Sequence, residues 1–221
     1  SLLEVPRFSE AGAATLREER GGWVYSFYRA RAPLFTVREG ELVHYPQRGS
    51  NGEADWRRFP LVGVSVEDVK GYLAWLDHTG ELPGARLCTG QEWERAARGA
   101  DGRNYPGGDA LHPEDANYDA TYGRRSFGPD MVGAHPASRS PFGLEDTAGN
   151  AYEQVQQPKA KLGSVVLRGG SWYYDYPSVN LANRIAGEPS LRSVLGGLRV
   201  CAPFPAPVGA PRRGDAPRPG E

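Results

Sequence analysis

Residues 167–201 read LRGGSWYYDYPSVNLANRIAGEPSLRSVLGGLRVC, and this stretch combines two kinds of sequence. Glycine and arginine dominate its ends, in RGGSW at 168–172 and GGLRV at 196–200, and Asn183-Arg184 lies in the middle. Between these motifs the chain is rich in tyrosine and serine and poor in lysine and glutamate. Glycine permits close backbone approach, and arginine can hold several carbonyl or carboxylate oxygens at once. The motifs therefore predict a rigid framework, and the residues between them predict a contact surface.

The bulk composition predicts a globular protein and excludes several classes. The chain has 221 residues, of which 39% are hydrophobic and 24% are charged. Its net charge of −1 gives no electrostatic reason to bind nucleic acid or a membrane surface. No apolar run approaches the roughly 18 residues that a membrane span needs. The chain begins at Ser1 and its only methionine is Met131, so we expect it to have been cut from a longer protein.

The two cysteines suggest a cellular location. Cys88 and Cys201 are the only cysteines, and neither belongs to a C-x-x-C pair. They can form one disulfide, but we expect two buried free thiols, because free cysteine behaves as a small hydrophobic residue. The predicted location is therefore the reducing cytoplasm.

Two capping motifs predict two helices. The residues SVED at 65–68 form a capping box, with serine at the N-cap and aspartate three residues later. Apolar residues then recur at helical spacing, and the helix should end near Gly80. The residues TGQE at 89–92 form a second capping box before a shorter helix that should stop at Gly99. The apolar face predicted for the first helix consists of Val69, Tyr72, Leu73 and Leu76.

Weaker patterns predict a third helix and several short strands. Residues 9–20, SEAGAATLREER, suit an amphipathic helix ended by two glycines. Strands are predicted at 23–29, 152–155, 165–167 and 198–201, with a hairpin at 34–38 and 41–45. Residues 100–145 consist almost entirely of turn formers, which is typical of functional loops or of loops ordered by bound ions.

Seven segments, taken in order, resemble the formylglycine-generating enzyme (sulfatase-modifying factor) family. They are PLVGVSVEDV at 60–69, YLAWL at 72–76, RLCTGQEWERAARG at 86–99, YPGGD at 105–109, PFGLEDTAGNAYE at 141–153, LRGGSW at 167–172 and GLRV at 197–200. The resemblance implies an α+β, C-type lectin-like fold with two small helices, little regular secondary structure and long ordered loops. Trp172 should then anchor the following loop in the core, and Arg168, Arg184 and Arg199 should tie the framework together.

The resemblance also divides the chain into three parts. It covers residues 60–202, which we expect to form the lectin-type domain. Residues 1–59 match the family poorly, and we expect a divergent N-terminal part of the same domain there. Residues 203–221 are rich in proline and are predicted to be a disordered tail.

Oxidase chemistry is the first function that the resemblance implies. Enzymes of the family hold copper with two cysteines just after the RGGS motif, and soft Cu(I) prefers such thiolates. The corresponding positions here are Tyr174 and Val179, and neither can supply a thiolate. We therefore predict that the chain is not an enzyme of this kind and requires no cofactor.

An iron site held by histidines, as in a sulfoxide-forming branch of the same family, is not favoured either. The four histidines are not at metal-ligand spacing, and we expect them to be solvated or packed. The family's first calcium site is only partly matched. Asn117-Tyr118 resembles one part of it, but the acidic residue expected near Arg125 is missing.

The family's second calcium site is matched at residues 146–153, DTAGNAYE. Calcium binds oxygen ligands, including backbone carbonyls in tight turns. The resemblance implies carboxylate ligands at Asp146 and Glu153 and carbonyl ligands at Gly149 and Ala151. Such an ion would be structural. The alternative is that Asp146 caps the turn and Glu153 pairs with an arginine.

The stretch between the framework motifs is similar to the variable region of diversity-generating retroelement proteins of this family. Those systems mutate adenines in AAY codons, which can then encode Tyr, Asp, Ser, Val, Asn, Leu, Ile or Ala but not Lys, Glu, Gln, Met or Trp. Over residues 173–195 only Glu188 belongs to the types that such codons cannot encode. Tyrosine suits such a surface because it offers a large contact area with little side-chain entropy. The predicted ligand-binding residues are Tyr173, Tyr174, Asp175, Tyr176, Ser178, Val179, Asn180, Ile185, Ala186, Ser190, Leu191, Ser193, Val194 and Leu195.

These patterns predict a non-catalytic protein that displays a diversified binding surface on a C-type lectin fold. The expected partner is a protein or another macromolecule, with no nucleic acid and no membrane. The first alternative is a fixed sensor or interaction domain of a signalling protein. The second is a formylglycine-generating-type oxidase. Changes confined to the predicted positions among sibling loci would separate diversification from a fixed domain.

Overall fold

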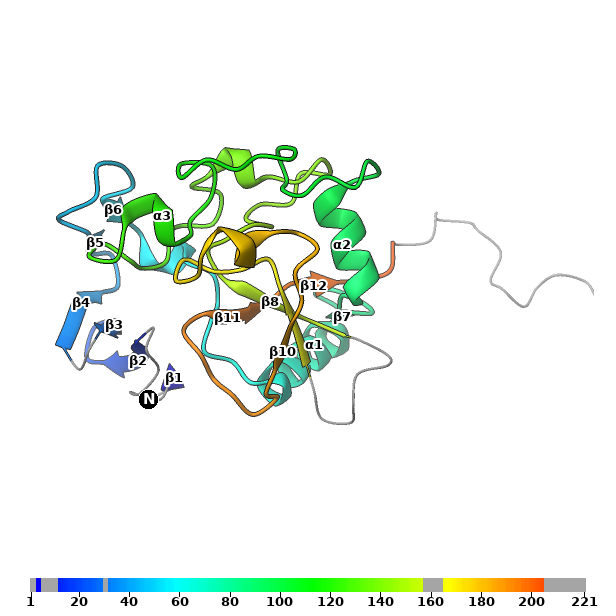
Figure 1. Cartoon of the computed structure of the whole chain (residues 1–221). Helices are drawn as coiled ribbons and strands as arrows, with labels where there is room; N and C mark the ends of the chain where they lie inside the picture. Colours follow the sequence, from blue (N-terminus) through cyan, green and yellow to red (C-terminus); the bar gives the residue numbers. More distant parts are fainter. Residues whose placement is uncertain (1–2, 5–11, 30–31, 157–164, 205–221) are drawn as a thin grey trace, which may run out of the picture.

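The computed structural model describes residues 3–4, 12–29, 32–156 and 165–204. Figure 1 shows a sheet near the N-terminus at one side of the molecule, helices α1 and α2 at the other side, and a second sheet between them. The predicted disordered tail, apart from its first two residues, lies outside the described residues. None of the helices in the described part of the chain is long and apolar enough to cross a membrane.

The first sheet has the order β1-β2-β3-β4 and is antiparallel throughout. Its strands are Leu3–Glu4, Ala13–Glu19, Gly22–Arg29 and Ala32–Arg38. The predicted helix over residues 9–20 is therefore wrong, because residues 13–19 form β2 and residues 9–11 lie outside the described part. Pairing with β3 from Ala13 to Glu19 supplies the backbone hydrogen bonds, and this tertiary context overrides a modest helix preference.

The hairpin predicted at 34–38 and 41–45 is also wrong. Strand β4 pairs with β3, while β5 (Val43–His44) pairs with β6 (Glu53–Ala54). The β3–β4 register places Phe27 opposite Phe35, with ring centroids 5.6 Å apart. Cross-strand aromatic pairs of this kind stabilise a sheet, so the aromatic strand β3 is the better partner for β4.

Both capped helices are confirmed. Helix α1 (Val66–Thr79) and helix α2 (Gly90–Arg98) each begin with the predicted capping box and end at Gly80 and Gly99. On α1, Val69 and Leu73 are buried, whereas Tyr72 faces solvent and stacks on Trp75. The loop over residues 100–145 contains only the short helices α3 (Asp119–Tyr122) and η2 (Pro136–Ser138), as its many turn formers predict.

The second sheet has the order β10-β9-β8-β11. Its strands are Ile185–Gly187, Val165–Arg168, Tyr152–Val155 and Gly196–Leu198, and β11 runs parallel to β8. The predicted last strand at 198–201 is divided. Leu198 ends β11, and β12 (Val200–Cys201) pairs instead with β7 (Arg86–Leu87). Arg199 lies between the two strands, and its guanidinium donates to the Glu153 carboxylate.

Trp172 anchors the stretch after RGGSW, as predicted. The residue is 2% exposed, and its ring lies 5.8 Å from that of Phe27 and 6.1 Å from that of Phe127. Phe27 belongs to the first sheet, and the same core cluster contains Tyr152 of the second sheet. One aromatic core therefore joins the N-terminal sheet to the C-terminal third of the chain.

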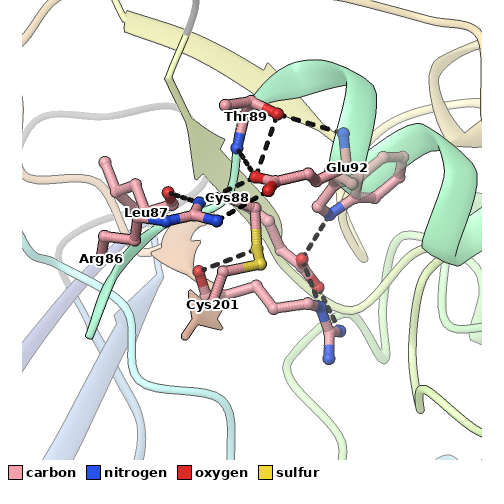
Figure 2. Close-up of a disulfide and its surroundings, with 9 residues drawn as sticks. Arg86, Leu87, Cys88, Thr89, Glu92 and Cys201 are labelled. Atoms are coloured by element: carbon pink, nitrogen blue, oxygen red, sulfur yellow. Dashed lines mark hydrogen bonds and ion pairs between the residues drawn. A yellow bond between two sulfur atoms is a disulfide. The ribbon is translucent and has the colours of Figure 1, made fainter. Parts of the chain in front are cut away.

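A disulfide joins Cys88 to Cys201, so the prediction of two free thiols is wrong. Figure 2 shows this bond between the entry to α2 and strand β12. The pairing of β7 with β12 brings the two cysteines together although 113 residues separate them. Sequence spacing carries no information about that pairing, and this is why the thiol prediction failed.

Candidate functional site

The tyrosine loop, defined here as residues 173–180, is an exposed turn followed by the short helix η3 (Tyr176–Val179). Tyr174 and Tyr176 are 43% and 41% exposed, and Asp175 between them is exposed as well. Tyr173 is half-buried and packs against Trp172. The loop therefore presents two tyrosines and a carboxylate to solvent from a firmly packed base.

Three of the predicted ligand-binding residues are core residues, so their assignment to the binding surface is wrong. Val179, Val194 and Leu195 are 0%, 1% and 6% exposed. Val179 packs on Gly170, which has φ +77, and a Cβ at that glycine would overlap the valine. Val194 and Leu195 belong to the aromatic core cluster. Their position within a polar stretch predicts exposure, but hydrophobic side chains favour burial, and these three pack the loops against the core.

Residues far away in the sequence brace the tyrosine loop from below. The ring of Tyr176 lies 4.9 Å from that of Tyr105, and Tyr174 lies 5.7 Å from Tyr152. The backbone of Tyr174 also accepts a hydrogen bond from the Asp119 amide. The sequence analysis missed Tyr105 and Tyr152 as supporting residues, although both lie inside the family-like motifs at 105–109 and 141–153.

Hydrogen bonds within the loop restrict it further. The Ser178 hydroxyl donates to Asp175 at 2.8 Å, and the Asn183 amide donates to the Ser178 carbonyl at 3.1 Å. The side chain of Asn180 accepts from the Ala182 amide at 2.8 Å. Ser178 and Asn180 are half-buried and therefore shape the loop as well as lining it.

The other predicted residues form a separate surface, the α1-side loop, defined here as residues 185–193. Pro189 accepts a hydrogen bond from the Val66 amide, and Ser193 accepts one from Gly63. Figure 1 shows the segment after β10 beside α1, whereas the tyrosine loop lies near α3. Ala186, Ser190 and Leu191 are exposed, whereas Ile185 and Ser193 are half-buried. The predicted array is therefore divided into two patches.

A bidentate ion pair fixes the α1-side loop to helix α1. Arg192 donates to both carboxylate oxygens of Asp68 at 2.6 and 2.7 Å. Hydrogen bonds from Arg192 and from Ser65 hold the pKa of Asp68 well below its usual range. The same aspartate closes the capping box of α1, so one carboxylate orders both the helix start and the loop.

The framework arginines tie carbonyls and carboxylates together, as predicted. Arg168 is fully buried and donates to Glu94 at 2.8 Å and to the Leu181 carbonyl at 2.7 Å. Arg184 donates to the same carboxylate at 2.7 Å. Arg199 donates to Glu153 and to the Glu145 carbonyl. These bonds hold the two ends and the middle of the 167–201 stretch in one framework.

Tyr174 and Val179, the positions that the resemblance assigns to the copper cysteines, carry no thiolate. Val179 is apolar and buried, and Tyr174 offers only a ring and a hydroxyl. Burial raises the pKa of the neighbouring Tyr152 to about 12, so its hydroxyl stays protonated near neutral pH. These side chains offer neither a soft ligand nor a base.

The residues predicted to bind calcium lie in one buried turn. Asp146 has φ 54 and accepts hydrogen bonds from the Gly133 amide at 3.1 Å and the Ser138 hydroxyl at 3.2 Å. Burial raises the pKa of Asp146, and these hydrogen bonds only partly offset that. Gly149 approaches the Asn117 backbone too closely for any side chain, and its carbonyl accepts from the Ala151 amide at 2.8 Å.

Glu153 pairs with an arginine, which is the alternative to calcium binding. Arg199 donates to both carboxylate oxygens of Glu153 at 2.5 and 2.6 Å, and the Trp93 indole donates at 2.5 Å. As arranged, these residues do not fit a calcium ion, because a guanidinium already neutralises Glu153 and both Asp146 oxygens have donors. Among the described residues, no three His, Cys, Asp or Glu side chains are grouped to hold a metal ion. These contacts favour the arginine pair over the predicted calcium site.

We expect calcium and a chelator to give the same melting temperature to within about 1 °C, because an ion that does not bind the folded state cannot stabilise it. Scanning calorimetry at matched ionic strength, with magnesium as the control, measures this. A rise of several degrees that is specific to calcium would show that the ion binds the folded state and would contradict this expectation.

Arg48 is a buried cation that the sequence analysis did not identify. Its guanidinium pairs with Asp130 and donates to the carbonyls of Ser126 and Gly128 at 2.9 and 3.0 Å. The side chains of Arg48 and Asp130 are 0% and 1% exposed. The Asp130 amide donates to Asn150, which also accepts from Asn117. Asn117 and Asp130 therefore share Asn150 as a hydrogen-bond partner, and Arg48 neutralises the Asp130 carboxylate.

His135 joins this network and should make stability depend on pH. Its two ring nitrogens face the Asp130 carboxylate at 2.8 Å and the Glu114 carbonyl at 2.9 Å, so both can donate when the ring is charged. Burial lowers the pKa of His135, but the hydrogen bonds to Asp130 and Glu114 outweigh burial and raise the pKa above its usual value.

A raised pKa in the folded state means that the folded protein binds the proton more tightly than the unfolded chain. The stabilisation from His135 is therefore fully present below the unfolded pKa of about 6.5 and is lost as pH rises through the folded value. We expect the free energy of unfolding to fall across this window in urea titrations. His135→Gln should remove that fall and the exposed control His78→Gln should retain it; equal slopes in both variants would contradict this role.

Comparison with known proteins shows which family the sequence of this chain matches. The model of the sulfatase-modifying factor enzyme 1-like domain matches residues 19–203. Serine/threonine-protein kinase pkn1 of Chlamydia pneumoniae is 30% identical over 203 residues, which is 83% of this chain and 29% of the kinase. Inactive C-alpha-formylglycine-generating enzyme 2 of Bos taurus is 34% identical over 58% of this chain and 43% of that protein.

Two further similarities bear on catalysis and fold. Hercynine oxygenase of Mycobacterium tuberculosis is 31% identical over 64% of this chain and 36% of that protein. Among solved structures, Treponema denticola variable protein 1 superposes with a TM-score of 0.59 at 16% identity, covering 89% of this chain and 98% of that one. The chain thus spans less than half of the curated relatives named here, and these relatives include both an oxygenase and an inactive enzyme.

Proposed function

Because this chain belongs to the sulfatase-modifying factor enzyme 1-like domain family and carries Tyr174 and Val179 at the copper-ligand positions, we propose that it is a non-catalytic ligand-binding protein. The observation that carries this proposal is the tyrosine loop. It exposes Tyr174, Asp175 and Tyr176 on a base that is held by buried aromatic rings and framework arginines. The expected partner is a protein or another macromolecule.

The physics of the loop supports recognition rather than chemistry. Exposed tyrosines supply a large amphipathic contact area, and only two side-chain torsions must be ordered when each one binds. The hydrogen bonds of Ser178 and Asn180 already order the backbone, so less conformational entropy remains to be lost on binding. The surface is an array of protruding side chains, which suits the flat face of a macromolecule.

We further propose that the exposed part of the 173–195 stretch is diversified. The likeness to Treponema denticola variable protein 1 concerns the fold, and it supplies a scaffold for such variation. The buried positions Val179, Val194 and Leu195 should then stay hydrophobic. The positions proposed to vary most freely are Tyr174, Asp175, Tyr176, Ala186, Ser190 and Leu191, all of which are exposed.

A tolerance experiment tests this division of the stretch. Replacing Tyr174, Asp175 and Leu191 together by other residues that AAY-derived codons encode should lower stability only slightly, by about 0.5 kcal/mol or less at each position. The matched control is Val179→Asn, which buries an amide and leaves a cavity, and it should lower stability by about 2 to 5 kcal/mol. Urea unfolding measures both effects, and equal losses in the two variants would contradict the proposal.

Sequencing sibling loci tests diversification directly. Changes confined to the exposed positions would support it, whereas uniform drift along the chain would overturn it. Uniform drift would favour the alternative function, a fixed sensor or interaction domain. The similarity to a much longer serine/threonine-protein kinase favours that alternative, because the chain covers 29% of the kinase.

The absence of catalysis is tested separately. We expect no product when the protein is incubated with copper, oxygen and a cysteine-containing peptide, because Tyr174 and Val179 cannot supply thiolates. Turnover that survives in a Tyr174→Phe variant would show a different catalytic group and would overturn the proposal.

The cytoplasmic location stays a prediction, but one of its premises is wrong. It relied on free thiols, and the structure joins Cys88 to Cys201. Structural disulfides persist in oxidising compartments and are rare in the cytoplasm. Fractionation of the native host, with the thiols trapped at lysis, would decide both the location and the redox state.

A further inference from the structure

A cavity of about 350 Å³ lies at the C-terminal end of α2, apart from both predicted binding surfaces. It contains none of the residues that the sequence analysis assigned to ligand or metal. Three arginines reach it, two from α2 and one from the middle of the 167–201 framework. Its lining residues are Gln91, Glu94, Arg95, Arg98, Gly99, Ala100, Gly102 and Arg184.

Positive charge exceeds negative charge in this cavity. Glu94 is the only carboxylate among the lining residues, and it pairs with Arg98 at 2.7 Å, with Arg184 at 2.7 Å and with the buried Arg168 at 2.8 Å. Burial raises the pKa of Glu94, but hydrogen bonds from these arginines lower it to about 2. The carboxylate is therefore ionised and can balance only one of the guanidinium groups around it.

Other negative groups do not cancel the excess. The exposed Asp101 lies two residues after Gly99, but an ion pair with Arg103 at 2.5 Å neutralises its carboxylate. The C-terminal end of a helix contributes roughly half a negative charge. The Arg95 guanidinium donates to the Gly99 carbonyl at this end, and Arg98 donates to Arg103 at 2.8 Å. Arg95, Arg98, Arg168 and Arg184 against Glu94 leave three positive charges, and the helix end reduces this excess to about two and a half.

Several guanidinium donors at the cavity have no protein partner in the described part of the chain. The Arg184 side chain is 55% exposed, and only its Nη2 is hydrogen-bonded. Arg95 is exposed, and of its nitrogens only Nη1 donates a hydrogen bond, while its guanidinium lies 6.0 Å from the centroid of the Phe142 ring. Behind them, the Nε of the fully buried Arg168 is unpartnered. Free guanidinium forks match the oxygens of phosphate and sulfate groups, which can accept two hydrogen bonds from one arginine.

We propose that this cavity binds a dianionic oxyanion, a phosphate or sulfate group, through Arg95 and Arg184. Arg98 and Arg168 add positive potential behind the two contacting side chains, and Glu94 orients Arg184. The site does not depend on the tyrosine loop. Because Arg184 follows the loop by four residues, a bound anion would also fix the framework beside it.

Isothermal titration calorimetry with sodium phosphate and with sodium sulfate, at constant ionic strength in chloride, tests the site. We expect Arg95→Gln and Arg184→Gln each to weaken binding about tenfold or more, since each removes charge-assisted hydrogen bonds. The matched control is Arg139→Gln, an exposed arginine that pairs with Glu145 outside the cavity and should bind as the unmodified chain does.

Phosphoserine and a phosphoserine peptide, tested on the same variants, distinguish a free phosphate from a protein-borne one. Tighter binding of either probe that is lost in Arg184→Gln supports the site and identifies its source. Binding no tighter than that of chloride, or equal losses in Arg139→Gln and Arg184→Gln, would overturn the proposal. Circular dichroism establishes that each variant is folded, and Arg95→Gln leaves every framework arginine in place.

Discussion

Replacing both Cys88 and Cys201 with alanine should lower the free energy of unfolding by about 3 to 5 kcal/mol. The disulfide closes a loop of 113 residues, and closing so long a loop removes much conformational freedom from the unfolded chain. Both cysteines also pack near the cluster around Trp93, so the substitutions remove a small amount of buried apolar surface. Urea unfolding of the oxidised and substituted proteins measures the difference.

Chemical reduction of the unmodified chain is the control for this experiment. Reduction breaks the bond and leaves both side chains, so it isolates loop closure from packing. A loss of similar size after reduction and after substitution would assign the effect to the cross-link. A reduced protein as stable as the oxidised one would contradict the prediction.

The consequence for the site is local as well as global. Cys88 belongs to the same core cluster as Trp93, whose indole shares the Glu153 carboxylate with Arg199. Cys201 ends the chain segment that carries this arginine, so the bond holds the last framework motif against the entry to α2. Hydrogen exchange should therefore rise first at β7 and β12 when the bond is removed.

Replacing Arg48 with methionine should lower the free energy of unfolding by about 3 to 5 kcal/mol, since it leaves a buried charge without its partner. Asp130 would keep hydrogen bonds from Tyr122 and His135, but it would lose its permanent cation. The carbonyls of Ser126 and Gly128 would lose their donors at the same time. Thermal and urea unfolding both measure the loss.

The double variant Arg48→Met with Asp130→Asn separates the pair from its surroundings. Removing both charges should restore part of the stability, because the cost of the single change is mainly that of an unpaired buried carboxylate. If the double variant lost more free energy of unfolding than the two single variants lose together, this explanation would be contradicted. Exchange should also rise around α3, which contacts the tyrosine loop through Asp119 and Tyr174.

Local signals predicted the helices well and the N-terminal strands poorly. The capping boxes at Ser65 and Thr89 each lie within four residues, so the start of each helix depends on local hydrogen bonds and not on distant residues. The stretch that forms β2 has no such signal. Its strand state depends on pairing with β3, and its helical pattern could not reveal that partner.

The candidate site shows the same division. Exposure at Tyr174, Asp175 and Tyr176 agrees with the prediction from composition. Val179 and Val194 satisfy the same codon rule but are buried in the core. Their burial depends on tertiary contacts, with Gly170 for Val179 and with the aromatic cluster for Val194. The supporting rings of Tyr105 and Tyr152 are likewise brought beneath the loop by tertiary contacts.

The sequence by itself determined the family, the two capped helices, the framework arginines and the lack of cysteine directly after the RGGSW motif, since each depends on residue identity or on short spacing. Only the tertiary structure decided the Cys88–Cys201 bond, the pairing of Arg48 with Asp130, the split of the predicted surface and the basic cavity at Arg95 and Arg184. The physical reason is that these features join groups far apart in the chain. Their energies come from burial and charge neutralisation, which exist only once the chain has folded around them.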